Sequence, residues 1–261
     1  MNYGLHLSAA GVLTNMYRQD VLANNLANVS TVGFKRDLAS ISQRPAETSE
    51  DHETHPYQHD ILDKIGGGVY AGAQRISFDV GPMQQTGNPL DLALESPDAF
   101  FVVAKPGERG KDELRLTRDG RFTRNAEGLL VTAVGGFKVL DADNTPIRIS
   151  DDQSVVVSND GRLQQGGVDV AQVQVATVKN RERLVKDGQN LLRYTGRPED
   201  RVAADRPRVR SGFVEASAVD PIRELLGLIE TSGAIQNNTN MIKYHDLMMD
   251  RAVNSLGRVT A

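Results

Sequence analysis

The sequence predicts an α+β protein in which a central antiparallel β-rich region is flanked by long N- and C-terminal helices. Three patterns carry this prediction: helical spacing of apolar residues near the start, a seven-residue repeat near the end, and short alternating runs between them. No alternation of strands and helices runs through the middle, which disfavours a doubly wound parallel sheet. We expect the two helices to pair as a coiled coil, because neither can bury its apolar stripe alone.

The first helix is expected from residue 3 to about residue 29. Its apolar residues recur at spacings of three and four, with no proline among them. They are Leu5, Ala9, Val12, Leu13, Met16, Leu22, Ala23 and Leu26. Gly33 follows the last of them and suits a reversal of the chain.

The second helix is expected from Pro221 to about residue 257, with Asp220 as its N-cap. Five apolar residues in succession fall seven apart: Leu228, Ile235, Ile242, Met249 and Leu256. A weaker companion row consists of Leu225, Ser232, Thr239, Asp246 and Val253. The repeat implies a left-handed supercoil, and a helix of roughly 37 residues would be ~55 Å long. It therefore requires a helical partner, for which the N-terminal helix is the obvious candidate.

Between the helices the apolar period changes to two. The expected strands lie in Val69–Val80, Leu90–Leu94, Phe100–Ala104, Leu129–Ala133, Phe137–Leu140, Val155–Val157, Val168–Val178 and Val209–Val214. Turn signals such as Asp119-Gly120 separate them, which indicates an antiparallel sandwich, barrel or meander. The polar stretches 42–66 and 196–208 are expected to be loops.

Composition excludes several classes of function. Among 261 residues, 30 Lys and Arg face 34 Asp and Glu, a net charge of −4 that lacks the electrostatic footprint of a general nucleic-acid binder. No apolar run approaches the roughly 18 residues that would span a membrane, and the first residues do not resemble a secretory signal. The chain has no Cys and no Trp, and 5% aromatic residues, which looks like a shortage of core-forming side chains.

Candidate chemistry is sparse. His52, His55 and His59 stand among acidic residues and could hold Zn or Ni, but their spacing fits no closed motif and a solvated loop is favoured. Asp91, Glu95 and Asp98 are expected to be ordinary strand and turn residues rather than a catalytic pair. We therefore expect no catalytic residues, no cofactor and no metal site.

Asparagines cluster at both ends: Asn24, Asn25 and Asn28, then Asn237, Asn238 and Asn240. One interpretation is a solvated helix face. The other is that amides between helices fix the register and orientation of the pair at some cost in stability.

The segment Ala23–Arg36, which reads ANNLANVSTVGFKR, resembles the N-terminal signature of bacterial flagellar axial proteins, the rod and hook family. Further blocks resemble the same family in the same order: Gly81–Leu94, Phe100–Val103, Leu116–Phe122 and Ser211–Pro221. The stretch Ser232–Gln236 departs from the Arg-Ala-Tyr/Phe-Glu block of the family.

The resemblance implies a structural subunit of the flagellar basal-body rod, not an enzyme. Its terminal helices would pack with other copies and with other rod subunits, in the periplasmic space, after export by the flagellar type III apparatus without a cleaved signal. The acidic stretch 42–66 replaces the Gln-, Pro- and Gly-rich insertion of distal-rod proteins, so the proximal-rod type is favoured. The alternatives are a distal-rod or hook-type subunit or, in a different class, an oligomeric β-domain enzyme or carbohydrate-binding protein.

Four segments are expected on this basis: an N-terminal helix with the axial-protein signature at 1–36, a polar connector at 37–66, a β-rich domain at 67–215 and a coiled-coil helix at 216–261. The expected subunit interface lies on the two helical seams. It comprises Leu5, Val12, Met16, Leu22, Asn24, Asn25, Leu26, Asn28, Leu228, Ile235, Ile242, Met249 and Leu256.

The seven-residue repeat generates a first prediction. Ile235→Asp combined with Ile242→Asp places two charges in the seam, and each buried Ile otherwise contributes roughly 1.5–3 kcal/mol. We expect the β domain to remain folded by circular dichroism while assembly and motility are lost. Swimming cells carrying the double variant would contradict the prediction.

Overall fold

The computed structural model describes residues 3–45, 67–107, 112–150, 154–204 and 207–256. The chain divides into two compact units. The helical unit comprises residues 1–27, 37–75 and 220–261, and the β unit comprises residues 28–36 and 76–219. This architecture confirms an α+β protein with a helix near each end and an antiparallel β-rich region between them.

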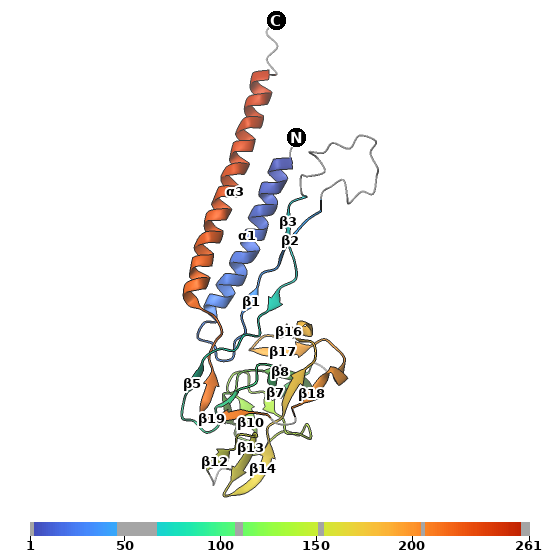
Figure 1. Cartoon of the computed structure of the whole chain (residues 1–261), viewed down its shortest axis with the longest axis vertical. Helices are drawn as coiled ribbons and strands as arrows, with labels where there is room; N and C mark the ends of the chain where they lie inside the picture. Colours follow the sequence, from blue (N-terminus) through green and yellow to red (C-terminus); the bar gives the residue numbers. More distant parts are fainter. Residues whose placement is uncertain (1–2, 46–66, 108–111, 151–153, 205–206, 257–261) are drawn as a thin grey trace. The chain divides into compact units, whose positions relative to one another are not determined.

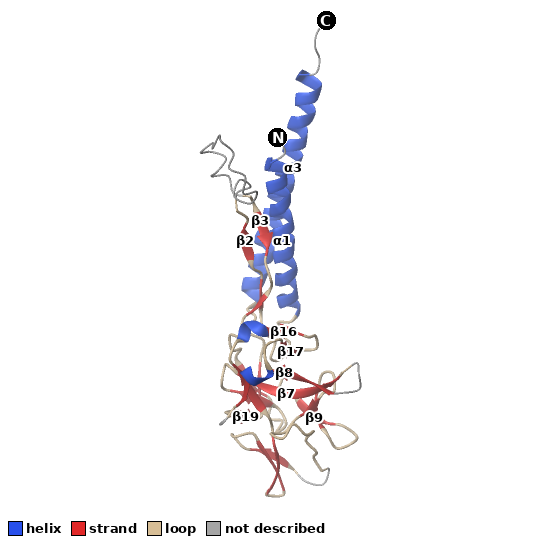
Figure 2. Ribbon diagram, turned by 90° about the vertical axis from the view of Figure 1, so that its right-hand side faces the viewer, coloured by secondary structure: helices blue, strands red, loops and turns tan. Residues whose placement is uncertain are grey.

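In the helical unit, α1 (Tyr3–Ala27) and α3 (Pro221–Leu256) lie side by side (Figures 1 and 2). Asp220 caps α3 as expected, since its Oδ1 accepts the N–H of Ile222 at 3.0 Å, and Pro221 needs no partner at the first position. Short antiparallel ladders complete the unit. They pair β2 (Ile41–Gln43) with β3 (Val69–Ala71), and β1 (Asp37–Leu38) with β4 (Arg75–Ile76).

The β unit is built on a nine-stranded sheet in which β7 (Ala99–Pro106) is central. One edge of β7 pairs with β8; the other pairs with β15 near its start and β11 near its end, all antiparallel. The remaining members extend the sheet outward from these. The strands are β8 (Asp112–Thr117), β9 (Phe122–Arg124), β10 (Leu130–Thr132), β11 (Lys138–Val139), β15 (Val175–Val178), β16 (Leu184–Lys186), β17 (Leu191–Tyr194) and β18 (Arg201–Ala203).

Smaller ladders and two short 3₁₀ helices complete the β unit. A three-stranded sheet joins β12 (Val155–Val157), β13 (Arg162–Gln165) and β14 (Val168–Gln172). Two further ladders pair β19 (Val209–Ser211) with β6 (Leu92–Leu94), and β20 (Phe213–Glu215) with β5 (Met83–Gln85). The 3₁₀ helices are η1 (Arg181–Arg183) and η2 (Pro198–Asp200).

The stretch 196–208 is not wholly a loop, which corrects the sequence prediction. It contains η2 and β18, and β18 pairs with β15 through Val202 opposite Thr177. Val202 is exposed, and charged residues surround it in the sequence, so no apolar alternation marks the strand. Backbone hydrogen bonds at the sheet edge, which carry no pattern of their own, form β18.

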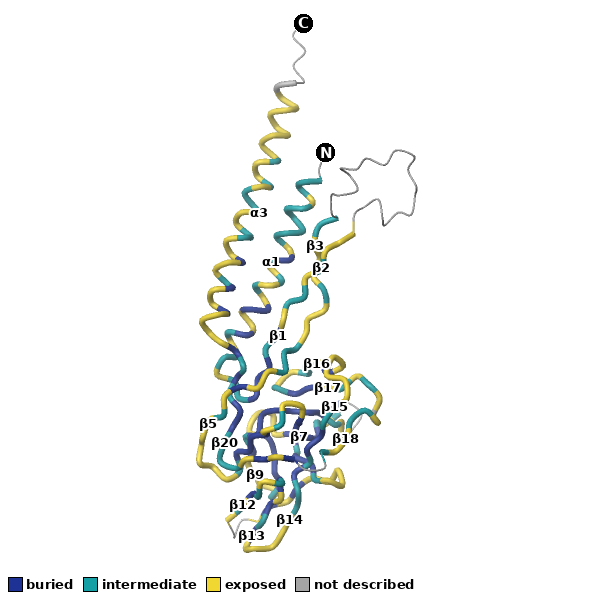
Figure 3. Tube along the Cα trace, in the orientation of Figure 1, coloured by how far each residue is buried: buried dark blue, intermediate teal, exposed yellow. Residues whose placement is uncertain are grey.

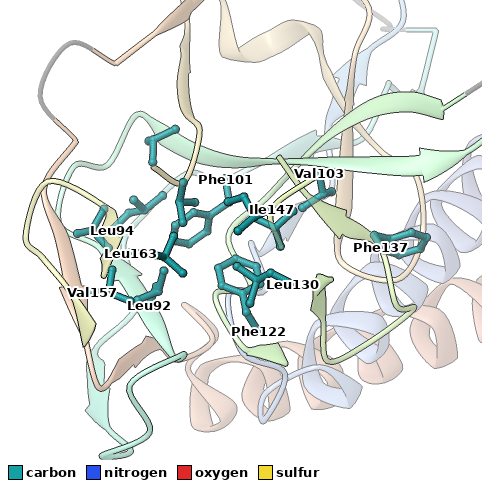
Figure 4. Close-up of a cluster of buried hydrophobic side chains, with 14 of the residues drawn as sticks. Leu92, Leu94, Phe101, Val103, Phe122, Leu130, Phe137, Ile147, Val157 and Leu163 are labelled. Carbon is teal, nitrogen blue, oxygen red and sulfur yellow. The ribbon is translucent and has the colours of Figure 1, made fainter. Parts of the chain in front are cut away.

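Alternation along β7 sends side chains into two separate cores. Phe101 and Val103 enter the larger core, whereas Phe100 and Val102 enter the smaller one, and all four are buried. In the larger core the rings of Phe101 and Phe122 meet edge to face with centroids 5.1 Å apart (Figure 4). The β unit therefore buries a core of its own despite its few aromatic residues.

The larger core generates a second prediction. Leu130 is fully buried there, so Leu130→Ala should lower the free energy of unfolding of the β unit by about 2–5 kcal/mol in urea denaturation. The exposed Val156 of the three-stranded sheet is the matched control. Val156→Ala should change the free energy of unfolding of the β unit by less than about 0.5 kcal/mol. Equal effects of the two substitutions would show that the cluster is not a core.

Candidate functional site

Glycines on α1 bring it close to α3 in one antiparallel register. Gly4 leaves room for the ring of His245, because a Cβ there would lie 2.8 Å from it. Gly11 leaves the same room for the side chain of Asn238, again at 2.8 Å. From the first pair to the second, the two helices advance by seven residues in opposite directions, as an antiparallel pair in fixed register must.

The same register continues to the other end of α1, where a buried amide joins three segments. Leu22 packs on Gly227, and three residues along each helix Asn25 meets Glu224. The Asn25 Nδ2 donates to the Glu224 carboxylate at 3.3 Å and to the Asp37 carbonyl at 2.8 Å, while its Oδ1 accepts the Asp37 N–H at 2.8 Å. Because Asn25 is fully buried, this geometry ties α1, α3 and the start of β1 together at one point.

The face of α3 toward α1 combines an apolar row with a polar companion row. The apolar row is half-buried and consists of Leu228, Ile235 and Ile242. The companions lie three residues after each of these and are Thr231, Asn238 and His245. The companion row predicted from sequence began instead at Leu225, which is 52% exposed. Toward α1, the small residues Gly4 and Gly11 instead admit the polar side chains of His245 and Asn238.

The remaining residues of the expected interface fall into different environments. Leu22 is buried, and Leu5, Val12, Leu26 and Asn28 are half-buried. Asn24, Met16 and Met249 are exposed. Asn28 belongs to the β unit, where its side-chain oxygen accepts the Thr31 hydroxyl at 3.1 Å. Leu256 ends α3, and its side chain lies outside the described residues.

A second apolar surface on α3 faces away from α1. We call its first part the base patch; it consists of Ile222, Leu225, Leu226 and Ile229, with Ile222 69% and Ile229 62% exposed. The second part, the distal patch, consists of Tyr244, Leu247, Met248 and Val253. Exposed turns follow this side of the helix in Figure 3. The sequence contained a signal for the base patch in the spacing of Ile222 and Ile229, seven residues apart, but the stronger repeat of Leu228 masked it.

The distal patch extends past the end of α1. In the register set by Gly4 and His245, Tyr3 at the start of α1 faces residue 246. The last ten residues of α3, 247–256, therefore extend beyond it by about 15 Å. Leu247, Met248 and Val253 lie in this extension.

Comparison with known proteins gives a consistent result across the chain. A curated relative from Caulobacter vibrioides, the flagellar basal-body rod protein FlgF, is 33% identical over 99% of this chain and 100% of its own length. The FlgF of Rhizobium meliloti is 29% identical over 98% of this chain and 99% of its own length. The rod protein FlgG of Bacillus subtilis is 30% identical over 96% of this chain and 97% of its own length. The chain belongs to the flagellar basal-body rod protein family.

Three descriptions within this family match separate parts of the chain. "Flagella basal body rod protein" matches residues 14–35, "Flagellar hook protein FlgE/F/G D1 domain" matches 96–165, and "Flagellar basal body rod FlgEFG protein C-terminal" matches 210–256. The first and third together include two of the four register contacts between α1 and α3, Leu22 with Gly227 and Asn25 with Glu224. The family is one of structural rod proteins and not of enzymes, so the alternative of an oligomeric enzyme is set aside.

The acidic residues considered for catalysis are engaged in ordinary pairs of the β unit. Asp98 binds Arg181 at 2.7 Å, Glu95 binds Arg210 at 3.2 Å, and Asp91 accepts a hydrogen bond from Asn88 at 3.0 Å. Within the described ranges, no group of three or more His, Asp or Glu side chains could hold a metal ion. His52, His55 and His59 lie outside those ranges.

Neither α1 nor α3, nor any other described helix, is long and apolar enough to cross a membrane. The polar residues along α3 are the physical reason. Thr231, Asn238 and Lys243 interrupt its apolar rows at intervals shorter than a membrane-spanning segment allows.

The buried amide generates a third prediction. Asn25→Ala removes buried hydrogen bonds to the Asp37 backbone and to the Glu224 carboxylate, so we expect the helical unit to lose about 1–3 kcal/mol of stability. Amide hydrogen exchange along α1 in the full chain measures this loss. The exposed Asp20 of α1 is the control, since Asp20→Ala should leave exchange nearly unchanged. Equal protection in both variants would contradict a special role for Asn25.

Proposed function

We propose that this protein polymerises through α1 and α3 with copies of itself and with other rod subunits, forming part of the drive shaft of the flagellar basal body. Membership of the rod family supports a structural subunit, and the two outward apolar patches of α3 support assembly. The base patch is the observation that carries the proposal, because four large aliphatic residues in little more than two helical turns are exposed.

The free energies favour a polymer over a single contact. Covering the four residues of the base patch would contribute at most about 6–12 kcal/mol, at roughly 1.5–3 kcal/mol for each side chain that goes from full exposure to full burial. Association costs about 4–15 kcal/mol in lost freedom of motion. For one such contact, the free energy of burial is close to the free-energy cost of association. A subunit that contacts several neighbours gains burial at each contact but loses its freedom of motion only once. This arithmetic supports growth on an existing end of the rod.

We also propose that α1 and α3 pair as an antiparallel coiled coil in the assembled rod. The seven-residue spacing of Leu228, Ile235 and Ile242 and the constant register with α1 support this pairing. The interface residues expected from sequence would then divide into two sets. Leu22, Asn25, Leu228, Ile235 and Ile242 would hold the pair together within a subunit, while Met16 would contact neighbours. The outward patches, which were not among the expected residues, would also contact neighbours.

The proximal rod is the proposed location, after export by the flagellar type III apparatus without a cleaved signal and within the periplasmic space. The relatives named FlgF and the absence of a Gln-, Pro- and Gly-rich insertion from 42–66 support the proximal type. The alternative within the family is a distal-rod or hook-type subunit, and relatives named FlgG match at similar identity. Imaging of basal bodies with a tagged subunit distinguishes the two.

For the whole chain, we propose that the segments 1–36 and 216–261 serve assembly, that 67–215 forms the β-rich body and that 37–66 connects them. Net charge and helix composition support the absence of nucleic-acid and membrane partners. The proposed partners are therefore proteins of the rod and of its export apparatus.

The base patch generates a fourth prediction. Leu225→Asp combined with Ile229→Asp adds charge to a surface that faces away from α1, so the purified chain should keep its helical content and its melting temperature within about 2 °C. Incorporation into basal bodies and swimming in soft agar should fall to the level of a deletion strain.

The matched control is Val168→Asp, an equally exposed apolar position on β14 of the β unit. It should swim as the wild type does. Normal swimming of the α3 double variant would overturn the proposal that the base patch is an assembly surface. Loss of helical content in that variant would instead show that the patch serves the fold of the single chain.

A further inference from the structure

A buried carboxylate in the β unit gathers three segments of the chain. Glu215 ends β20, and its Oε1 accepts from the Lys35 ammonium at 2.7 Å and from the Gly81 N–H at 3.0 Å. Its Oε2 accepts from the Arg118 guanidinium at 3.2 Å. All three charged side chains are at least 98% buried. We call Lys35, Arg118 and Glu215 the linker clamp.

The positions of these residues along the chain are the reason for the name. The chain passes between the helical unit and the β unit four times, after residues 27, 36, 75 and 219. Lys35 lies one residue before the second passage, Gly81 lies six residues after the third, and Glu215 lies four residues before the fourth. One carboxylate thus holds the β-unit side of every connecting segment.

Backbone contacts hold the same segments against one another. The Gly33 N–H donates to the Glu215 carbonyl at 2.6 Å, and the Ala218 N–H donates to the Phe34 carbonyl at 3.3 Å. Gly33 has φ +69°, and a Cβ there would lie 2.5 Å from the Arg118 carbonyl carbon, so no other residue fits without a shift. The segment 28–36, which we call the first linker, is therefore bound at several points and not only at Lys35.

A cation on strand β16 also binds the first linker. The Lys186 ammonium of β16 donates to the Lys35 carbonyl at 2.7 Å and lies 3.8 Å from the centroid of the Phe34 ring. Arg118 also donates to the carbonyls of Ser96 and Pro97, which anchors the clamp to the turn before β7. The linkers are thus fastened to the central sheet of the β unit.

A buried set of two cations and one carboxylate is a poor way to gain stability alone. Desolvation is large, and apolar residues of similar volume are often as stable. Burial lowers the pKa of the Lys35 ammonium below its ordinary value, even though Glu215 raises it. Charged, directional contacts differ from apolar packing because they fix one geometry and resist sliding of the segments past one another.

We propose that the linker clamp bears load, and that it prevents the segments 28–36, 76–82 and 215–219 from peeling off the β unit when the helices are pulled. Only the source of that load, torque carried along a rod, rests on the proposed function. The resistance itself is a property of the single chain. It is therefore measurable on monomers, independently of assembly.

The test is single-molecule pulling on the full-length chain, which contains no Cys and so accepts two handles cleanly. Ala27→Cys at the end of α1 and Val168→Cys on β14 are both exposed, and pulling them apart places the segments 28–36, 76–82 and 215–219 under tension together. Because these segments join the same two units, their release from the β unit should appear as one early step, the linker step, before the core of the β unit unfolds. In Glu215→Gln, which keeps the shape and removes the charge, this step should occur roughly ten- to a hundredfold faster at equal force.

The matched control is Glu113→Gln, which removes an exposed carboxylate from its 2.6 Å pair with Arg115 and should leave the linker step unchanged. An unchanged step in Glu215→Gln would overturn the proposal. Equal weakening of the linker step and of the later core steps would also overturn it, because it would show a general stabiliser.

Lys35→Met is the second variant, and it retains the pair between Glu215 and Arg118. Lys35→Met should also accelerate the linker step. It replaces Glu215→Gln as the test if that variant does not fold. If neither variant folds, the clamp is a requirement of folding and the load-bearing proposal fails. A failure here leaves the assembly proposal intact, and loss of assembly in the base-patch variant leaves this one intact.

Discussion

The close approach of α1 and α3 in one register is the constraint on which the helical unit depends. Gly4 and Gly11 allow the helices to approach, and Asn25 sets their alignment through Glu224 and Asp37. A seam built from small and polar groups tolerates little slippage, because a shifted amide would lose its partners in a buried place. The same choice leaves large aliphatic residues exposed on the outer side of α3.

The β unit solves a different problem with the opposite chemistry. Its central strand β7 divides aromatic and aliphatic side chains between two cores, so the unit is stabilised by its own burial. Three of its buried charged groups, Lys35, Arg118 and Glu215, meet where connecting segments arrive. Apolar packing thus supplies the stability of the unit, and buried polar contacts supply its fixed connections.

Much of the fold was predictable because its signals are local. The helix bounds agree within two residues at each end, since spacing, a cap and a proline specify them. β18 was missed because an edge strand can form through backbone bonds alone, without alternation around Val202. The outward face of α3 was not predicted because the heptad row of Leu228 identifies one seam, while the residues that accompany it toward α1 depend on what α1 presents.

Sequence alone determined the order of the elements, the seven-residue repeat and the resemblance to axial proteins, because each is written in consecutive residues. It also identified asparagines as candidates for setting the register, but it could not separate Asn25 from Asn24. The tertiary structure decided that, since burial depends on which side of α1 meets α3. It alone revealed the linker clamp, because Lys35, Arg118 and Glu215 lie up to 180 residues apart and meet only when the chain has folded.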